Sequence, residues 1–237
     1  MPTARKTLRL VDDLISGGLV PSGRRGDLER VAQRYALALT ADVVDHINPA
    51  DPRDPIARQF VPDPLELATS DIESADPIAD DAHSPIEGIV HRYPDRVLLK
   101  LTHVCAVYCR FCFRREMVGP GGRGGLSREA LAAALGYVRA HPDIWEVILT
   151  GGDPLVLSPR RLKEVVSQLA EIEHVKIIRV HTRVPVVEPS RITPALVRAL
   201  KAQGKATYVV LHANHARELS PEAVSYTHLT LPTKRIV

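Results

Sequence analysis

The feature that most constrains the fold is a regular alternation of short apolar runs and longer helical patterns after residue 91. Four apolar runs predict buried strands, at residues 97–101, 146–150, 176–180 and 206–211. Three intervening segments have helical periodicity, at residues 127–140, 158–172 and 193–203. Ser127, Ser158 and Thr193 stand where N-cap residues accept backbone hydrogen bonds. Strands that alternate with such helices pair in parallel through right-handed crossovers, so we predict an α/β fold with about four strands.

The residues before this unit have a different character. Residues 8–15 and 27–47 place apolar side chains at helical spacing, which predicts two helices. Residues 49–88 are rich in Pro and Asp and show little periodicity. We therefore expect residues 1–90 to form a helical region followed by an extended connection that wraps over a neighbouring unit. A partly disordered linker is the alternative for that connection.

All three cysteines, Cys105, Cys109 and Cys112, lie within eight residues, on the loop after the first predicted strand. An odd, clustered set is a poor disulfide framework but a good set of metal ligands. In a cubane 4Fe–4S cluster, three thiolates would leave the fourth iron open to chelate a small molecule. The alternative is a zinc-binding module with His103 as a fourth ligand, although zinc sites usually carry a second pair of ligands.

Further polar residues follow the other predicted strands. Gly151, Gly152 and Asp153 come after the second strand, and Thr182 and Arg183 come after the third. The sequence His212-Ala-Asn-His follows the fourth. In parallel α/β folds this edge of the sheet is where sites are built. Glycine there would let the backbone approach a ligand closely.

Several of these motifs resemble the lysine 2,3-aminomutase family of radical S-adenosylmethionine (SAM) enzymes. The segments that carry the resemblance are DPIARQFVPDPLEL, HRYPDRVLLKLTHVCAVYCRFCFRREMVG, LTGGDPLVLS, HTRVPVVEPSRITPALV and HANH. The resemblance runs from about Asp51 to Ser220. It implies a radical SAM (β/α) barrel, here partial and formed by residues 91–223, because a closed barrel needs more chain than remains after Leu211.

The resemblance also implies an activity. Members of this family are isomerases that move the α-amino group of L-lysine to the β-carbon with a 4Fe–4S cluster, SAM and pyridoxal 5′-phosphate (PLP). A related enzyme acts on a lysine of elongation factor P and shares the wording around the cysteines. The HRYPDR segment is more similar to the enzymes that act on free lysine. Both remain hypotheses at this point.

Site roles follow from the matched positions. The resemblance assigns the cluster to Cys105, Cys109 and Cys112; SAM to Gly151, Gly152, Asp153 and His212; PLP to Arg92, Tyr93 and Arg96; and the substrate α-carboxylate to Arg114. An arginine fork suits phosphate and carboxylate because it forms paired, charge-assisted hydrogen bonds. Phe111 fits the family pattern, and Asn214 and His215 are expected to support His212. Glu116 departs from the family, which often has a basic residue there.

Composition argues against other classes of protein. The formal net charge of +3 is small for 237 residues, so neither nucleic acid nor an anionic membrane is predicted as a partner. No apolar run is long enough to span a membrane, and the N-terminus lacks the features of a secretory signal. We expect a cytoplasmic protein whose partners are L-lysine and a reducing electron donor. A homo-oligomer is compatible with these expectations.

The last residues, SYTHLTLPTKRIV, do not continue the preceding pattern. We expect residues 224–237 to be a non-native tail, with a short C-terminal strand as the alternative. The family's PLP-anchoring lysine belongs to its C-terminal half, and Lys234 lacks the motif that surrounds it. The catalytic residue is therefore not identified, and we expect the chain as written to be an incomplete fragment that does not convert lysine to β-lysine.

Overall fold

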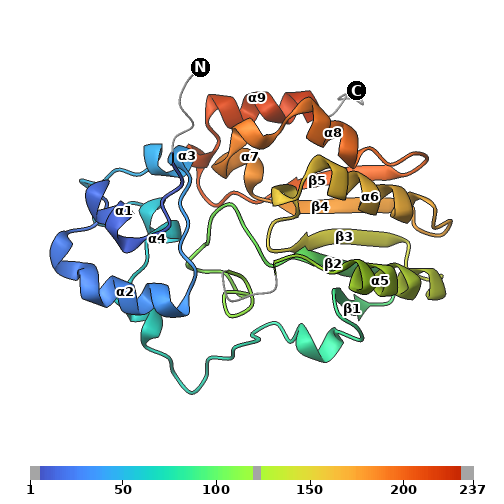
Figure 1. Ribbon diagram of the computed structural model, residues 1–237, viewed down its shortest axis with the longest axis horizontal. Coiled ribbons are helices and arrows are strands. Elements are labelled where there is room, and N and C mark those ends of the chain that lie inside the picture. Colours follow the sequence, from blue (N-terminus) through green and yellow to red (C-terminus); the bar gives the residue numbers. More distant parts are fainter. Residues whose placement is uncertain (1–5, 120–123, 231–237) are drawn as a thin grey trace.

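The computed structural model describes residues 6–119 and 124–230, with the backbone alone for residues 226–230. Its centre is a five-stranded sheet in the order β1-β2-β3-β4-β5 (Figure 1). The strands are β1 (Ile89–Tyr93), β2 (Arg96–Thr102), β3 (Glu146–Gly151), β4 (Ile177–Thr182) and β5 (Ala206–Leu211). Strands β2 to β5 are parallel, as predicted, and β1 runs antiparallel to β2. The α/β class and the partial barrel are confirmed, and the sheet is open.

Strand β1 is the element that the sequence pattern did not predict. It forms a hairpin with β2 in which Tyr93 pairs with Arg96 across a two-residue turn. The sequence did not predict this strand, because its apolar run is short and Pro94 is typical of loops and strand edges. The Asp95 carboxylate accepts hydrogen bonds from Arg96 Nε at 2.9 Å and Trp145 Nε1 at 3.1 Å. These contacts fix the turn against the residue that precedes β3.

The helices between the strands follow the predicted caps closely. They are α5 (Arg128–Ala140), α6 (Pro159–Ala170) and α8 (Pro194–Leu200). The hydroxyls of Ser127, Ser158 and Thr193 accept backbone N–H bonds from the first turns, which confirms all three caps. Helix α8 ends at Leu200, before the predicted residue 203, since Lys201 is extended. Alternate strand residues such as Leu99, Val147 and Ile178 are buried in the same core as the helices, whereas Lys100 and Ile148 occupy the intervening strand positions.

The single helix predicted over residues 27–47 is wrong. The chain forms α2 (Arg25–Arg34), then turns extended at Tyr35, and resumes as α3 (Ala41–Asp45). Between the helices, Leu39 pairs with Leu8 through two backbone hydrogen bonds of 2.8 and 2.9 Å. Tyr108 N donates to the carbonyl of Ala38 at 3.2 Å, so this extended segment packs against the cysteine loop. Tertiary pairing thus overrides the local helical pattern.

The remaining elements are short. They are α1 (Val11–Ser16), α4 (Ala57–Phe60), α7 (Val184–Val187), α9 (Pro221–Thr230) and the 3₁₀ turns Ser22–Arg24, Pro64–Leu67, Asp81–His83, Pro154–Val156, Pro189–Arg191 and Ala216–Glu218. Helix α1 overlaps the segment predicted as helical at residues 8–15, but it begins at Val11 and ends at Ser16. Helix α9 crosses residue 224, where the pattern predicted no continuing helix, and the rest of the proposed tail, residues 231–237, lies outside the described residues.

The connection from the first helices to β1 crosses the molecule as an irregular chain (Figure 1). It is anchored by buried contacts rather than by regular structure. The Phe60 side chain is fully buried, and Glu66 pairs with Arg110 of the cysteine loop at 2.6 Å. Asp54, also buried, pairs with Arg217 at 2.5 Å. No helix among the described residues is both long and apolar enough to cross a membrane.

Thr40 offers a test of how the N-terminal helices attach to the sheet unit. Its hydroxyl donates to the buried carbonyl of Val187 and accepts from Val43 N at 3.4 Å. Thr40→Val keeps the shape but leaves that carbonyl unpaired, so we expect a loss of about 1–3 kcal/mol in urea unfolding. Thr69→Val, at an exposed site, is the control and should change stability by less than about 0.5 kcal/mol. Equal effects of the two substitutions would contradict this attachment.

Candidate functional site

The three cysteines lie on the loop that follows β2, and all three thiols are free. Each is partly buried, and together they border one cavity of about 50 Å³ beside Tyr35. Burial is the largest cause that raises the pKa of every one of these thiols. A buried thiolate is costly without a nearby positive charge, which a metal centre supplies.

The three thiols are a donor set that suits an iron–sulfur cluster. Within residues 6–119 and 124–230, no three or more His, Cys, Asp or Glu side chains are placed to hold one metal ion. A cubane does not need such convergence, because each thiolate binds a different iron. A structural zinc site would need four ligands around one point. The donor set of three thiols around one cavity therefore suits the 4Fe–4S cluster.

Gly151 and Gly152 join the end of β3 to the start of the cysteine loop. Gly152 N donates to the Thr102 carbonyl at 2.5 Å, and Asp153 N donates to the Val104 carbonyl at 2.9 Å. A Cβ on Gly152 would overlap Val104, and Gly151 has a φ of +120°. The sequence predicted that these glycines let a ligand approach the backbone. In the structure they let the backbone of residues 102–104, next to Cys105, approach closely.

Asp153 is a buried brace between β3 and β4. Its carboxylate accepts hydrogen bonds from Leu155 N at 3.0 Å, Thr182 Oγ1 at 2.7 Å and Arg183 N at 2.7 Å. Burial raises the pKa of this carboxyl group, and the three donors oppose that shift. Both oxygens are engaged by the protein, so a ligand contact from this motif would come from its backbone. The assignment of SAM to these three residues stays a prediction.

Arg183 connects the cysteine loop to two segments that the sequence analysis did not single out. Its Nη1 donates to Cys109 Sγ at 3.1 Å, and its Nη2 donates to Gln59 and Glu218, each at 2.5 Å. Arg183 and Glu218 are both buried, with side chains 6% and 4% exposed. Such a buried ion pair depends on further hydrogen bonds, which both Nη atoms make here, whereas Nε is buried without a partner among the described residues. Arg183 thus holds a cysteine in place through a network anchored on α4.

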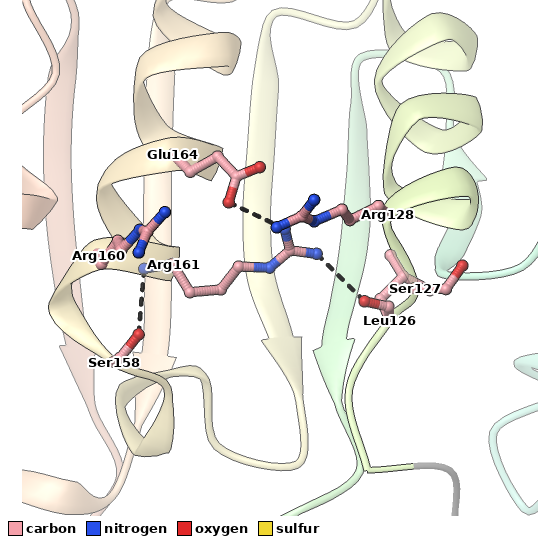
Figure 2. Close-up of a pocket in the computed structure, with 7 residues that line it drawn as sticks. All are labelled: Leu126, Ser127, Arg128, Ser158, Arg160, Arg161 and Glu164. Atoms are coloured by element: carbon pink, nitrogen blue, oxygen red, sulfur yellow. Dashed lines mark hydrogen bonds and ion pairs between the residues drawn. The ribbon is translucent and has the colours of Figure 1, made fainter.

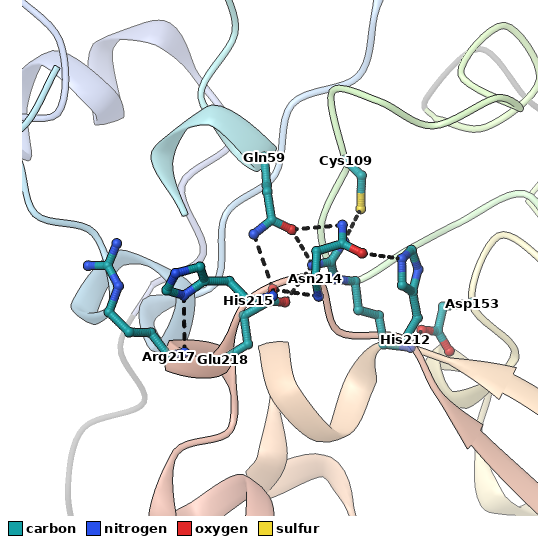
Figure 3. A network of polar contacts seen from close by, with 9 residues as sticks. Gln59, Cys109, Asp153, His212, Asn214, His215, Arg217 and Glu218 are labelled. Carbon is teal, nitrogen blue, oxygen red and sulfur yellow. Dashed lines mark hydrogen bonds and ion pairs between the residues drawn. The ribbon is translucent and has the colours of Figure 1, made fainter. Parts of the chain in front are cut away.

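The network continues to the residues after β5 (Figure 3). Glu218 accepts from the backbone N–H groups of Asn214 and His215, at 2.9 and 2.8 Å. Asn214 Oδ1 lies 2.9 Å from His212 Nε2, so Asn214 supports His212 as expected. The His215 ring instead accepts from Arg217 N at 3.1 Å. His212 is exposed, and its ring centre lies 6.0 Å from that of Phe111 in an edge-to-face arrangement. Both rings therefore lie at the outer rim of the site.

Gln59 and Glu218 were missed because each looks ordinary in sequence. Gln59 falls in a Pro-rich stretch, and Glu218 follows HANH among other charged residues. One feature of the sequence could have pointed to them: several polar residues follow β5, and a buried arginine needs hydrogen-bond partners.

Arg114 and Arg92 meet at one carboxylate, that of Asp80. Arg114 Nε donates to Asp80 Oδ2 at 2.7 Å, and Arg92 Nη2 lies 3.9 Å from Asp80 Oδ1. The Asp80 side chain is 2% exposed. Lys100 lies nearby on β2, and burial lowers the pKa of its amine. The residues predicted for PLP and for the substrate carboxylate are therefore adjacent, around an acid that the sequence analysis did not name.

Tyr93 and Arg96 are less closely placed. Tyr93 is 59% exposed, with the Arg96 guanidinium 5.8 Å from its ring centre. Arg96 pairs with Asp95 at 2.8 Å and lies 3.7 Å from Glu146, so in this structure it faces the hairpin turn. Arg92 alone of the three predicted PLP contacts reaches Asp80.

Glu116, which departs from the family pattern, has a local explanation. Its carboxylate accepts from the Tyr35 hydroxyl at 3.0 Å and from Arg34 Nη2 at 3.2 Å. Arg115 stacks over the same tyrosine ring at 4.5 Å. Both residues thus secure the cysteine loop against the end of α2.

Comparison with known proteins agrees with this geometry. Residues 99–230 match the family model of the radical SAM superfamily, and the chain belongs to that superfamily. It is 40% identical over 187 residues to an L-lysine 2,3-aminomutase of Clostridium subterminale, covering 79% of this chain and 44% of the relative. It is 41% identical over 200 residues to one of Methanococcus maripaludis, covering 83% and 45%. For the L-lysine 2,3-aminomutase of Escherichia coli K12 the identity is 37% over 185 residues, covering 78% and 53%.

The chain spans about half the length of the curated relatives that it matches.

The contact at Gly152 predicts a measurable loss of stability. Gly152→Ala forces its new methyl group into the Val104 carbonyl, so the β3 end or the cysteine loop must shift. Overpacking of this kind costs about 1–3 kcal/mol, which the urea midpoint would report. Gly136→Ala is the control, because nothing lies near that position on α5 and alanine favours a helix. It should be neutral or stabilising; a Gly152 variant as stable as the control would refute the close contact.

Asp80 predicts a response to added anion. Asp80→Asn removes the charge that two arginines share, so we expect a loss of roughly 1–3 kcal/mol of stability. Inorganic phosphate should then raise the melting temperature of the variant more than that of the parent, because it can replace the carboxylate between the guanidiniums. The neighbouring exposed residue gives the control, Asp81→Asn. An equal phosphate effect in both variants would count against an anion site here.

Proposed function

We propose that the protein is a radical SAM aminomutase that moves the α-amino group of free L-lysine to the β-carbon, with a 4Fe–4S cluster, SAM and PLP. The observation that carries this proposal is the meeting of Arg92 and Arg114 at Asp80. Arg114 is two residues beyond Cys112, so an anion-binding pair lies beside the cluster loop. A phosphorylated cofactor and an amino-acid carboxylate are two anions that such a pair suits.

Each cofactor would be bound by a different group of residues. Cys105, Cys109 and Cys112 would hold the cluster; the backbone of the Gly151–Asp153 turn and His212 would contact SAM; and Arg92, with Tyr93 and Arg96, would bind PLP. When bound, the cluster with SAM supplies one-electron radical chemistry and PLP supplies delocalisation of electrons from the amine. The names of the related L-lysine 2,3-aminomutases support lysine as the substrate.

The protein's own side chains would position and shield the reactants. Arg114 bonds Asp80 through Nε, so its terminal nitrogens are those that a substrate carboxylate would meet. The fork geometry fixes the orientation of a planar carboxylate as well as its position. Phe111 and His212 lie at the rim, where they would limit the access of water to a reactive radical.

The cluster assignment has a direct test. Anaerobic reconstitution should give about one 4Fe–4S cluster per chain, seen as bound iron and sulfide and as visible absorbance. Cys109→Ala removes one of three ligands and should abolish the cluster. Stoichiometric zinc without iron or sulfide in the parent protein would overturn the assignment and favour a zinc-binding module.

The choice of substrate is tested in the complete protein by supplying SAM, PLP and a strong reductant with either free lysine or elongation factor P. We expect β-lysine from free lysine, measured by chromatography, and an unchanged mass of elongation factor P. If only elongation factor P is converted, the proposal of free lysine is wrong and the substrate is the protein lysine.

A further inference from the structure

A concave surface adjoins the cysteine loop at Cys105. One cavity, of about 380 Å³, is lined by Cys105, Ala106, Gly124, Gly125, Val156, Leu157, Thr7, Arg9, Thr102, Val104, Glu188 and Arg191. A second, of about 770 Å³, is lined by Leu126, Ser127, Arg128, Ser158, Arg160, Arg161 and Glu164 (Figure 2). The segments 124–128 and 156–161 run from one cavity into the other. We call the two together the outer groove.

The outer groove is positively charged. Its lining contains five arginines and two glutamates, which leaves a formal charge of +3. Arg161 pairs with Glu164 at 3.0 Å, and Arg191 lies 3.7 Å from Glu188. The other three arginines, Arg9, Arg128 and Arg160, are exposed. The whole chain carries only +3, so the groove concentrates the charge of the molecule on one surface.

Cys105 links this surface to the cluster site. It lines the outer groove and also the small cavity that Cys109 and Cys112 border. Cys105 is thus the cysteine that the groove and the cluster cavity have in common. Phe111 and His212, where SAM is expected, line neither cavity of the outer groove. The outer groove therefore offers a partner a route to the cluster that does not pass Phe111 and His212.

We propose that the outer groove is the docking surface for a small acidic electron-transfer protein that reduces the cluster past Cys105. This rests on the proposed function, because radical SAM chemistry begins with one electron entering the cluster. The reduced donor loses one electron, the cluster gains it, and no bond or proton is exchanged. Electron-transfer encounters use small interfaces steered by opposite charges, which suits a groove of this size and sign.

The composition of the groove favours a protein over other anionic partners. Its lining includes no aromatic side chain on which a nucleic-acid base could stack. The large apolar residues of the lining, Leu126, Val156 and Leu157, are only partly exposed. Exposed large apolar residues such as Leu65 and Ile72 lie on the connecting segment and not in the groove, so the groove offers little to insert into a lipid surface.

The test measures binding and electron delivery separately. Affinity of the 237-residue chain for a purified flavodoxin is measured by biolayer interferometry at several salt concentrations. The test variant is Arg128→Glu combined with Arg160→Glu. The control is Arg139→Glu, a reversal of the same kind at the opposite end of α5, about 17 Å along the helix axis from Arg128. Cluster reduction is followed by bleaching of visible absorbance, with either reduced flavodoxin or dithionite.

We expect flavodoxin binding to weaken as salt rises, and roughly tenfold weaker binding in the double variant than in the control. Reduction by flavodoxin should slow to a similar extent, while reduction by dithionite should be unchanged, since a small reductant needs no docking. Salt-independent binding, or equal losses in the double variant and the control, would overturn the docking surface. Tighter, equally charge-dependent binding of DNA or anionic vesicles would also overturn it. Failure of dithionite to bleach any chromophore would instead refute the cluster, so the two proposals fail in different ways.

Discussion

The site depends on one buried carboxylate, that of Asp153. Removing a charge from water is unfavourable unless hydrogen bonds replace the lost solvation, and here three protein donors do so. Two of them belong to Thr182 and Arg183, so the same carboxylate fixes the turn after β4. The backbone at Gly152 and Asp153 meanwhile pairs with Thr102 and Val104. The ends of three strands are thereby held in one arrangement, and the cysteine loop begins from that fixed point.

Arg183 connects the Asp153 carboxylate to more distant parts of the chain. Its backbone is held by Asp153, while its side chain reaches Cys109, Gln59 and Glu218. Gln59 belongs to α4 and Glu218 to the residues after β5, so segments far apart in the chain converge on one guanidinium. The planar, multidentate shape of arginine makes this possible, since a lysine could not bond all of these groups in fixed directions. The position of a cysteine in the cluster loop is therefore coupled to the packing of the N-terminal helices.

Much of this could be predicted from the sequence, and the failures have physical causes. The strands after residue 91 and the Ser127, Ser158 and Thr193 caps depend on local patterns, which the sequence carries directly. The helix predicted over residues 27–47 fails because Leu39 gains a strand-like partner in Leu8, a contact set by tertiary structure. Asp80 and Gln59 could not be selected in advance, since their importance comes only from the arginines that the fold brings to them. The cysteines could, because their chemistry is rare and their spacing is local.

Two groups of arginines lie near the cysteine loop, and they differ in how their charge is balanced. Arg92 and Arg114 lie around Asp80, whose single carboxylate balances one of their two positive charges and leaves the other for an anionic ligand. In the outer groove Arg9, Arg128 and Arg160 face solvent, where charge acts over about a Debye length rather than at one bonded site. The first arrangement favours selective binding of a small anion, since a ligand must displace or share a buried carboxylate. The second favours rapid, reversible encounters. In the proposed function, the first group would bind the anionic ligands and the second would receive the electron donor, with the cysteine loop next to both.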